Sequence, residues 1–449
     1  MSEGVGTVGM DTPPRLAVDR LLDDRETRII VCCGAGGVGK TTTAAALGVR
    51  AAGRGRKAVV LTIDPARRLA QSMGIDSLDN TPRKVETVGA GDGELHAMML
   101  DMKRTFDEIV EAHADGERAR AILANPFYQS LSAGFAGTQE YMAMEKLGQL
   151  RARDDWDLII VDTPPSRSAL DFLDAPKRLG SFLDGKFIRV LMAPAKVGGR
   201  AGMKFLNVGM SMMTGTLSKL MGASLLKDVQ TFVAAMDTMF GGFRTRADAT
   251  FRLLQAPGTA FLVVAAPEAD ALREAAYFVE RLAAESMPLA GLVLNRVHVS
   301  GADQLSAERA LAAAENLEEG GIVDQESGKA GLRDPGAEPT GTTETTETAP
   351  TERTAQTTRT AQTANPPETG SPGTEGDTAV VDRITAGLLR LHAERMQVIA
   401  REQRTRDRFT SLHPEVAVAE VAALPGDVHD LAGLRAIGER LAAGVPAGA

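Results

Sequence analysis

The chain has 449 residues and a formal net charge of −9, and 43% of its residues are hydrophobic. This length predicts two subdomains and a linker rather than one simple core. No run of about 18 apolar residues is present, which excludes a membrane-spanning helix. The two adjacent cysteines, Cys32 and Cys33, are too few for a cysteine-based zinc site or a disulfide framework.

The amino-terminal stretch, residues 1–26, predicts a flexible leader. It is polar and contains Pro13 and Pro14, with a short helix expected from Arg15 to Leu22. It lacks the basic and apolar regions of a signal peptide. We therefore expect a cytoplasmic protein with at most peripheral membrane contact.

A phosphate-binding loop is predicted within residues 28–50, which read RIIVCCGAGGVGKTTTAAALGVR. The apolar run Ile29–Cys33 predicts a strand, and the alanine-rich segment after the loop predicts a helix. The glycines turn backbone N–H groups toward a phosphate at a helix N-terminus, Lys40 reaches the β- and γ-phosphates, and the Thr41 hydroxyl ligates Mg²⁺. The predicted nucleotide contacts of this loop are Gly34, Ala35, Gly36, Gly37, Val38, Gly39, Lys40, Thr41 and Thr42.

Six further apolar segments predict strands at 58–63, 95–100, 157–162, 260–265, 289–297 and 416–424. They alternate with helical patterns and end in polar residues, which predicts the doubly wound, mostly parallel α/β sheet of a P-loop NTPase. We expect the ATPase domain to comprise residues 27–317 and to be completed by its C-terminal part, 379–449.

Two predicted crossovers, 102–156 and 165–258, are far longer than a crossover requires, and we expect them to form a helical subdomain over the active-site edge. The second crossover is rich in methionine, a residue that fits varied apolar partners but is also common core filler. The sequence leaves open whether these residues form an exposed groove or a core. They are Met192, Met203, Met210, Met212, Met213, Met221, Met236 and Met239.

Residues 318–378 differ from the rest of the chain in composition. They are rich in Thr, Glu, Pro and Gly and carry twelve acidic and four basic residues, which accounts for most of the net negative charge. Such a segment cannot bury enough apolar area to fold, so we expect a disordered linker. The remainder is nearly neutral and has no clustered basic excess, which predicts no nucleic-acid partner.

Two aspartates close neighbouring predicted strands. Asp162 has the form of a Walker B carboxylate that holds Mg²⁺ through its water shell. Asp64 ends the strand over 58–63 and is the candidate to orient or deprotonate the water that attacks the γ-phosphate, close to the metal. The sequence therefore predicts ATP and Mg²⁺ as cofactors, with Thr41, Asp64 and Asp162 on the metal side and Lys40 and Asp64 as the catalytic pair.

Several segments resemble the arsenical-pump ATPase family, which includes the ATPases that target tail-anchored membrane proteins. They are GAGGVGKTT, TIDPARRLAQSMG, WDLIIVDTPP, the Pro267-Glu268 pair, VLNRV and LPGDVHDLAGL, in the same order as in the family. The resemblance covers about 28–300 and 380–443. It implies an ATP-hydrolysing dimer, and a hydrophobic client groove at the methionine-rich crossover.

The resemblance also implies roles for individual residues. Asp64 resembles the water-activating aspartate of switch I, and Asp162 the magnesium-side aspartate of switch II. Glu268 and Asn295 resemble contacts to the nucleotide base and ribose, and the segment from Pro425 to Asp427 resembles the loop that closes over adenine.

Three departures from the family pattern bear on function. Family members usually carry a lysine second in the loop, which reaches the partner's ATP, whereas this chain has Ala35. The zinc-binding cysteines of the targeting members and the metalloid-binding cysteines of the arsenite-activated members are absent. The family's TAPTGHT after switch II is TPPSRSA here.

Three functions follow as alternatives. The leading hypothesis is an ATP-driven dimeric switch, homodimeric or paired with a related ATPase, that binds a hydrophobic or membrane-associated protein client. The second is a catalytically weak ATP-binding regulatory subunit of a heterodimer, whose paralogous partner supplies the lysine. The third, a DNA- or division-site partitioning ATPase, shares the loop but fits less well, because no basic patch is evident.

Overall fold

The computed structural model describes residues 14–63, 68–75, 78–86, 93–126, 128–129, 138–164, 245–319 and 374–443. Two compact units divide the chain: the larger comprises residues 1–303 and 398–449, and the smaller comprises residues 304–397. Within the described residues, no helix has the length and apolar character needed to cross a bilayer.

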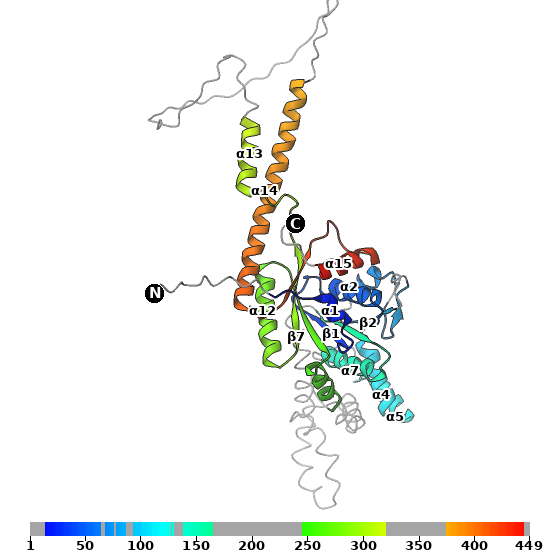
Figure 1. Ribbon diagram of the computed structural model, residues 1–449. Helices are drawn as coiled ribbons and strands as arrows, with labels where there is room; N and C mark the ends of the chain where they lie inside the picture. The colour runs from blue at the N-terminus through cyan, green and yellow to red at the C-terminus, as the bar shows by residue number, and fades with distance from the viewer. Residues whose placement is uncertain are drawn as a thin grey trace, which may run out of the picture. The chain divides into compact units, whose positions relative to one another are not determined.

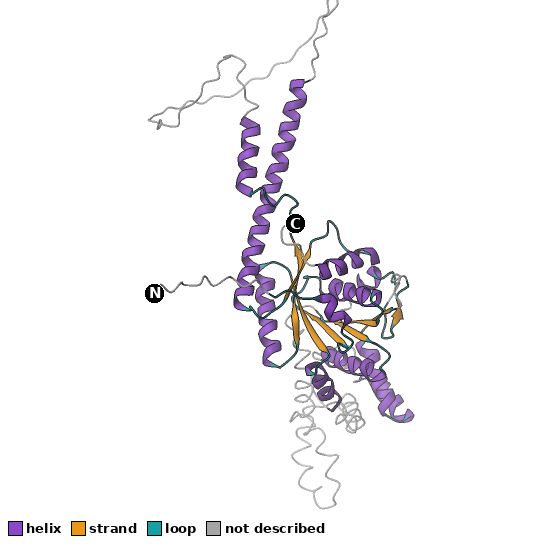
Figure 2. Cartoon of the chain, viewed as in Figure 1, coloured by secondary structure: helices purple, strands orange, loops and turns teal. Residues whose placement is uncertain are grey.

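An eight-stranded sheet lies at the centre of the larger unit, in the order β3-β4-β2-β5-β1-β6-β7-β8 (Figures 1 and 2). All neighbouring strands pair in parallel except β3 and β4. The α/β fold with a mostly parallel sheet is therefore as predicted. The strands are β1 Ile29–Cys33, β2 Lys57–Thr62, β3 Arg83–Lys84, β4 Glu94–Met99, β5 Leu158–Asp162, β6 Thr259–Ala265, β7 Leu289–Val297 and β8 Val418–Ala422.

The sheet buries alternate residues of β1 in two separate apolar clusters. Ile29 and Val31 face the cluster that includes Phe278, whereas Ile30 and Cys32 face the cluster that includes Leu47. Because both faces of the sheet are covered, its inner strands read as continuous apolar runs, which is why the sequence predicted them.

One face of the sheet is covered by α1 Val18–Asp23, α2 Lys40–Gly53 and α15 Leu431–Ala443. Here the structure corrects the predicted leader, because residues 14–26 belong to the packed unit. Arg15 forms a bridge with Val418 of β8, and Leu16 and Leu22 are buried. The apolar residues of this stretch are buried by docking on α2, on α15 and against β7 and β8. Residues 1–13 lie outside the described residues.

The other face is covered by α4 Met102–His113, α5 Gly116–Leu123, α7 Thr138–Arg153, α12 Ala269–Ala284 and a helical stretch over 245–255. Phe106 of α4 and Leu147 of α7 belong to the same apolar cluster as Leu61 of β2. The described helices of the first crossover thus share the core of the sheet. A short helix, α3 Arg68–Ser72, follows β2.

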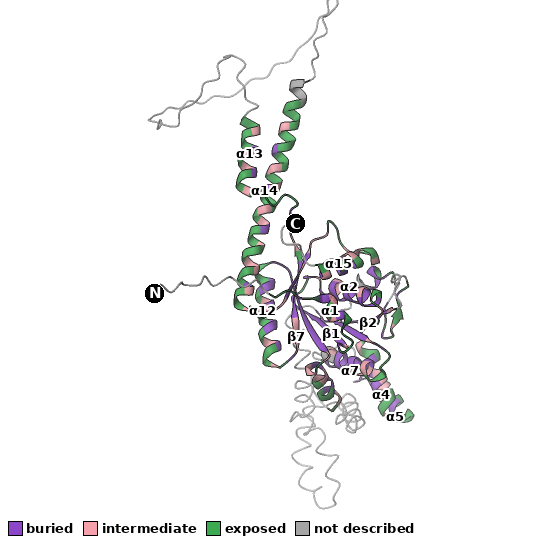
Figure 3. Ribbon diagram, in the orientation of Figure 1, coloured by how far each residue is buried: buried purple, intermediate pink, exposed green. Residues whose placement is uncertain are grey.

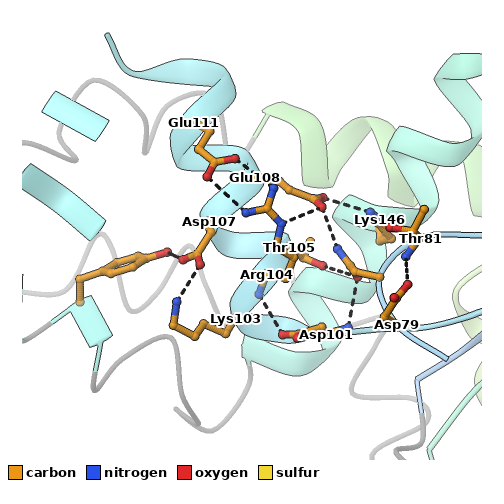
Figure 4. A network of polar contacts seen from close by, with 12 residues as sticks. Asp79, Thr81, Asp101, Lys103, Arg104, Thr105, Asp107, Glu108, Glu111 and Lys146 are labelled. Carbon is orange, nitrogen blue, oxygen red and sulfur yellow. Dashed lines mark hydrogen bonds and ion pairs between the residues drawn. The ribbon is translucent and has the colours of Figure 1, made fainter. Parts of the chain in front are cut away.

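Charged residues between α4 and α7 form a connected network (Figure 4). The Lys146 Nζ atom lies 3.0 Å from Glu108 Oε2, and Asn80 donates to the other oxygen of Glu108 at 3.2 Å. Asp101 caps α4 by accepting from the backbone N–H of Arg104 at 2.9 Å. The Lys146 ammonium is nearly buried, so the carboxylate of Glu108 is needed to compensate its loss of hydration.

The smaller unit contains α13 Ala307–Glu319 and the first part of α14 Thr374–Leu412. Both helices extend into the predicted linker, whose central part, 320–373, lies outside the described residues. The methionines Met192 to Met239 also lie outside them, so the prediction of a client groove there stays a prediction.

Candidate functional site

The loop between β1 and α2 requires glycine at positions where another residue would collide. Gly34 has φ +145° and Gly39 has φ +95°, conformations that L-residues rarely adopt. A Cβ atom on Gly34 would lie 2.1 Å from the carbonyl oxygen of Val264, and one on Gly39 would lie 2.2 Å from Asn295 Nδ2. The loop therefore lies directly against the backbone of β6 and against the Asn295 side chain of β7.

Lys40, the first residue of α2, turns back into this loop. Its Nζ atom donates to the carbonyl oxygen of Ala35 at 2.7 Å, and the residue is only 6% exposed. An ammonium group at the N-terminal end of a helix and inside a glycine-rich loop adds to the positive potential that favours a phosphate. Ala35 itself is buried against the apolar cluster beneath α2.

Asp162 stands where three chain segments meet. The register places it beside Cys32 of β1 and beside Thr62 of β2, and it is fully buried. Its Oδ2 atom accepts from the Thr41 hydroxyl at 2.7 Å and from the Thr62 hydroxyl at 2.9 Å. The carboxylate at the end of β5 thereby fixes the first turn of α2.

This donor set fits Mg²⁺. Because Thr41 donates its proton to Asp162, the lone pairs of its hydroxyl oxygen remain available to a cation, and Mg²⁺ prefers oxygen ligands and retains several waters. Thr41 would bind the ion directly, and Asp162 would hold it through coordinated water.

Asn295 reaches the loop from β7. Its Nδ2 atom donates to the carbonyl oxygen of Val38 at 2.8 Å, and the residue is buried. The structure therefore places this predicted base or ribose contact against the phosphate loop itself. Arg296, the next residue, has φ 63° at a bulge in the pairing of β7 with β8.

The other predicted contacts lie at the carboxyl ends of the same parallel strands. Glu268 follows β6 and occupies the N-cap position of α12, where its side chain makes no capping hydrogen bond. Pro425 and Asp427 follow β8 and are exposed. Asp64, the predicted water-activating residue, lies outside the described residues, so its role stays a prediction.

Two hydroxyl groups at this edge were missed by the sequence reasoning. Thr62 supports Asp162, and the Thr163 hydroxyl donates to the carbonyl oxygen of Cys32 at 2.9 Å. The available signal was a threonine at the end of each apolar strand, where a buried hydroxyl needs a partner.

The paired cysteines behave as apolar residues. Burial raises the pKa of the Cys33 thiol to about 12 and raises the pKa of Cys32 as well, with the carboxylate of Asp162 adding to the effect on Cys32. Both thiols stay protonated at neutral pH, so neither provides the thiolate that a soft metal requires.

A glycine-rich loop between a strand and a helix, an inward lysine and a buried aspartate bonded to the following threonine define a P-loop NTPase. The sequence model of the family described as anion-transporting ATPase matches residues 27–319. The chain belongs to that family, as its motifs predicted.

Individual relatives match over parts of their length. The ATPase GET3 of Malassezia globosa is 31% identical over 173 residues, which cover 38% of this chain and 49% of the relative. The ATPase GET3 of Podospora anserina is 26% identical over 280 residues, covering 62% of this chain and 75% of the relative. A putative arsenical pump-driving ATPase of Halobacterium salinarum is 28% identical over 203 residues, covering 43% of this chain and 31% of the relative.

Proposed function

We propose that the chain binds ATP with Mg²⁺ and hydrolyses it in the cytoplasm, and that the nucleotide cycle opens and closes a dimer. The observation that carries this proposal is the arrangement of Lys40, Thr41 and Asp162 around one glycine-rich loop. Lys40 would exchange its bond to the Ala35 carbonyl for phosphate oxygens. Bound Mg²⁺ would neutralise charge on the β- and γ-phosphates.

In this proposal the closed dimer binds a hydrophobic or membrane-associated protein. The support is family membership together with relatives named ATPase GET3 and arsenical pump-driving ATPase. ATP can shift the equilibrium between the open and the closed dimer only if it binds the closed dimer more tightly than the open one.

The deciding experiment is ATP hydrolysis per subunit, measured over a wide range of protein concentration. Activity that rises with concentration and is lost in Asp64→Asn, while nucleotide binding is retained, supports a self-sufficient dimeric ATPase. Lys40→Ala should abolish binding itself. Equal turnover in Asp64→Asn and the natural chain would remove Asp64 from its proposed role.

A second candidate is a regulatory subunit that binds ATP and depends on a lysine-bearing paralogue for turnover. The observation that favours it is Ala35, which is buried and has no cation to offer a partner's nucleotide. In this case the chain alone binds ATP with no turnover above that of Asp64→Asn, and Ala35→Lys gains turnover. Ala35→Met, which places a side chain of similar length but no charge at the same position, is the matched control and should gain none.

A further inference from the structure

The strand order indicates on which side of the phosphate loop a nucleoside would lie. Thr41 and Asp162, the residues that fit Mg²⁺, meet between β1 and β5. Mg²⁺ bridges the β- and γ-phosphates of a nucleoside triphosphate. The ribose and base are joined to the other end of the triphosphate, so we place them over β6, β7 and β8, which lie on the opposite side of β1. Asn295, which contacts the phosphate loop from the end of β7, lies on this side.

The segment 424–430, which we call the β8–α15 loop, lies at the far end of that side. It follows the carboxyl end of β8, and ligands of doubly wound sheets bind outside the carboxyl ends of the strands. Pro425 and Asp427 are exposed in the middle of the loop. Leu424 and Val428, nearer its two ends, pack against the apolar cluster beneath α2. The apolar side chains therefore anchor the loop, and its exposed middle is available to a ligand.

Arg440 of α15 holds the start of the β8–α15 loop. Its Nη1 atom donates to the carbonyl oxygens of Ala422 at 2.8 Å and Ala423 at 3.1 Å. The N–H group of Ala423 in turn donates to the carbonyl oxygen of Val297 in β7 at 2.9 Å. Hydrogen bonds from a charged donor are stronger than those between neutral groups. The guanidinium of Arg440 therefore fixes the point at which the chain leaves β8.

The end of the β8–α15 loop is fixed by the start of α15. Asp430 Oδ1 accepts from the backbone N–H of Gly433 at 2.8 Å, as a helix cap does. Gly433 leaves room for the loop, since a Cβ atom on it would lie 3.0 Å from Val428 Cγ1. Contacts within the protein thus hold the loop at both ends.

The helix that carries Arg440 also packs closely on the helix of the phosphate loop. A Cβ atom on Gly438 would lie 3.3 Å from the carbonyl oxygen of Ala46 and 3.4 Å from Arg50 Cβ, both in α2. The buried residues of α15 share one apolar cluster with residues of α2, and the outer side of α15 is exposed (Figure 3). One helix is therefore fixed to the phosphate side of the site at Gly438 and to the β8–α15 loop at Arg440.

We propose that Arg440 is a positioning residue, which holds the β8–α15 loop as a binding surface for the ribose and base at a fixed distance from the phosphate loop. This inference rests on the ATP binding proposed above. A loop that is already held in its binding conformation loses less conformational entropy when a ligand binds. Replacement of Arg440 should therefore weaken the binding of the ribose and base, and leave the binding of the phosphates around Lys40 unchanged.

A comparison of ATP with tripolyphosphate, which has three phosphates and no nucleoside, tests this proposal. Binding of each to the full chain is measured by titration calorimetry with Mg²⁺ present. We expect the natural chain to bind ATP more tightly than tripolyphosphate. Arg440→Met should weaken ATP binding about tenfold and change the affinity for tripolyphosphate by less than about twofold. Arg440→Lys, whose ammonium can still donate to one of the two carbonyl groups, should recover part of the loss.

The matched control is Arg20→Met, which removes the same charge from an exposed position of α1 and should bind both ligands like the natural chain. Tripolyphosphate binding by Arg440→Met reports that the larger unit remains folded, and Arg440→Lys keeps the test available if that variant does not fold.

Three results would overturn the inference while leaving the proposed ATP binding in place. They are an unchanged ATP affinity in Arg440→Met, an equal loss for both ligands in Arg440→Lys, and a natural chain that binds ATP and tripolyphosphate equally tightly. A natural chain that binds neither ligand would overturn the proposed function, and this inference with it.

Discussion

The sheet of the larger unit and the hairpin of the smaller unit distribute their apolar residues in opposite ways. In β1 every side chain is buried, including large ones such as Ile30 and Val31, and the phosphate loop is positioned by that packing. In the hairpin formed by α13 and α14 the alanines Ala310, Ala314, Ala386 and Ala393 are buried, whereas Leu388 and Leu391 of α14 are exposed. The hairpin therefore buries little apolar area, so its stability should depend more than that of the sheet on what covers it.

The largest expected effect on the stability of the larger unit comes from replacing Arg56. Its guanidinium is buried and donates to four carbonyl oxygens, those of Leu22, Asp24, Thr27 and Asp157. Burial lowers the pKa of the Arg56 guanidinium, and the four carbonyl groups stabilise its positive charge. Arg56→Met leaves these acceptors without their donor, and we expect a loss of about 4 kcal/mol in the free energy of unfolding.

This loss is measured by urea unfolding followed through Trp156, the single tryptophan of the chain. Arg20→Met, at an exposed position of α1, is the control and should change the unfolding free energy by less than about 0.5 kcal/mol. If both variants unfolded at the same urea concentration, Arg56 would not hold the leader, β2 and β5 together.

Arg246 forms an ion pair with Glu145 on the face of the sheet that α4 and α7 cover. Its Nε atom lies 2.8 Å from Glu145 Oε1, and the Glu145 side chain is only 4% exposed. Arg246→Met leaves a buried carboxylate that retains a hydrogen bond from Tyr141, and we expect a loss of about 3 kcal/mol.

The companion variant Arg246→Met/Glu145→Gln removes the charge and should recover part of this stability. Arg151→Met breaks the exposed pair with Asp154 and should cost at most about 1 kcal/mol. A double variant no more stable than Arg246→Met would mean that the packing of Arg246 matters, and not the charge of Glu145.

Ala386→Leu tests the packing between α13 and α14 in the smaller unit. A leucine at this fully buried position is too large for the space between α13 and α14, and we expect a local cost of about 2 kcal/mol. Amide hydrogen exchange in the two helices should accelerate by a factor of about 30. The unfolding transition reported by Trp156 should not move. A shift of that transition would show that hairpin and sheet unfold together.

The difference between the apolar sheet and the smaller unit also explains which elements the sequence predicts correctly. The seven strands of the sheet that are buried read as apolar runs, and the predicted segments match them within two residues at each end. β3 was missed because it consists of only Arg83 and Lys84, both exposed, which pair with β4 through the backbone. The spacing of Ile384, Leu388 and Leu391 is helical, but it does not indicate that these three side chains are exposed while Ala386 and Ala393 are buried.

At the site, the sequence predicts what is local and misses what depends on register. Lys40 and Thr41 follow from the spacing of the loop alone. The bond between Thr62 and Asp162 depends on the pairing of β2 with β5, 100 residues apart in the sequence. The bond from Asn295 to Val38 depends likewise on the order β1-β6-β7.

The smallest expected effect concerns Asp19, which joins the corrected leader segment to α2. Arg50 donates to both of its oxygens, and this hydrogen bonding holds the pKa of Asp19 below its usual value near 3.8, against the opposing effect of partial burial. Because the folded-state pKa is depressed, the stabilisation is fully present above pH 3.8 and is lost as the pH falls through the folded-state value. With 37% of the Asp19 side chain exposed, solvent screening reduces the contribution of this ion pair to about 0.5 kcal/mol.

Asp19→Asn should therefore unfold at a slightly lower urea concentration than the natural chain at pH 6. This difference in unfolding midpoint should shrink below pH 3.8 and in 1 M salt. A difference that persisted at low pH would assign the effect to the shape of the Asp19 side chain and not to its charge.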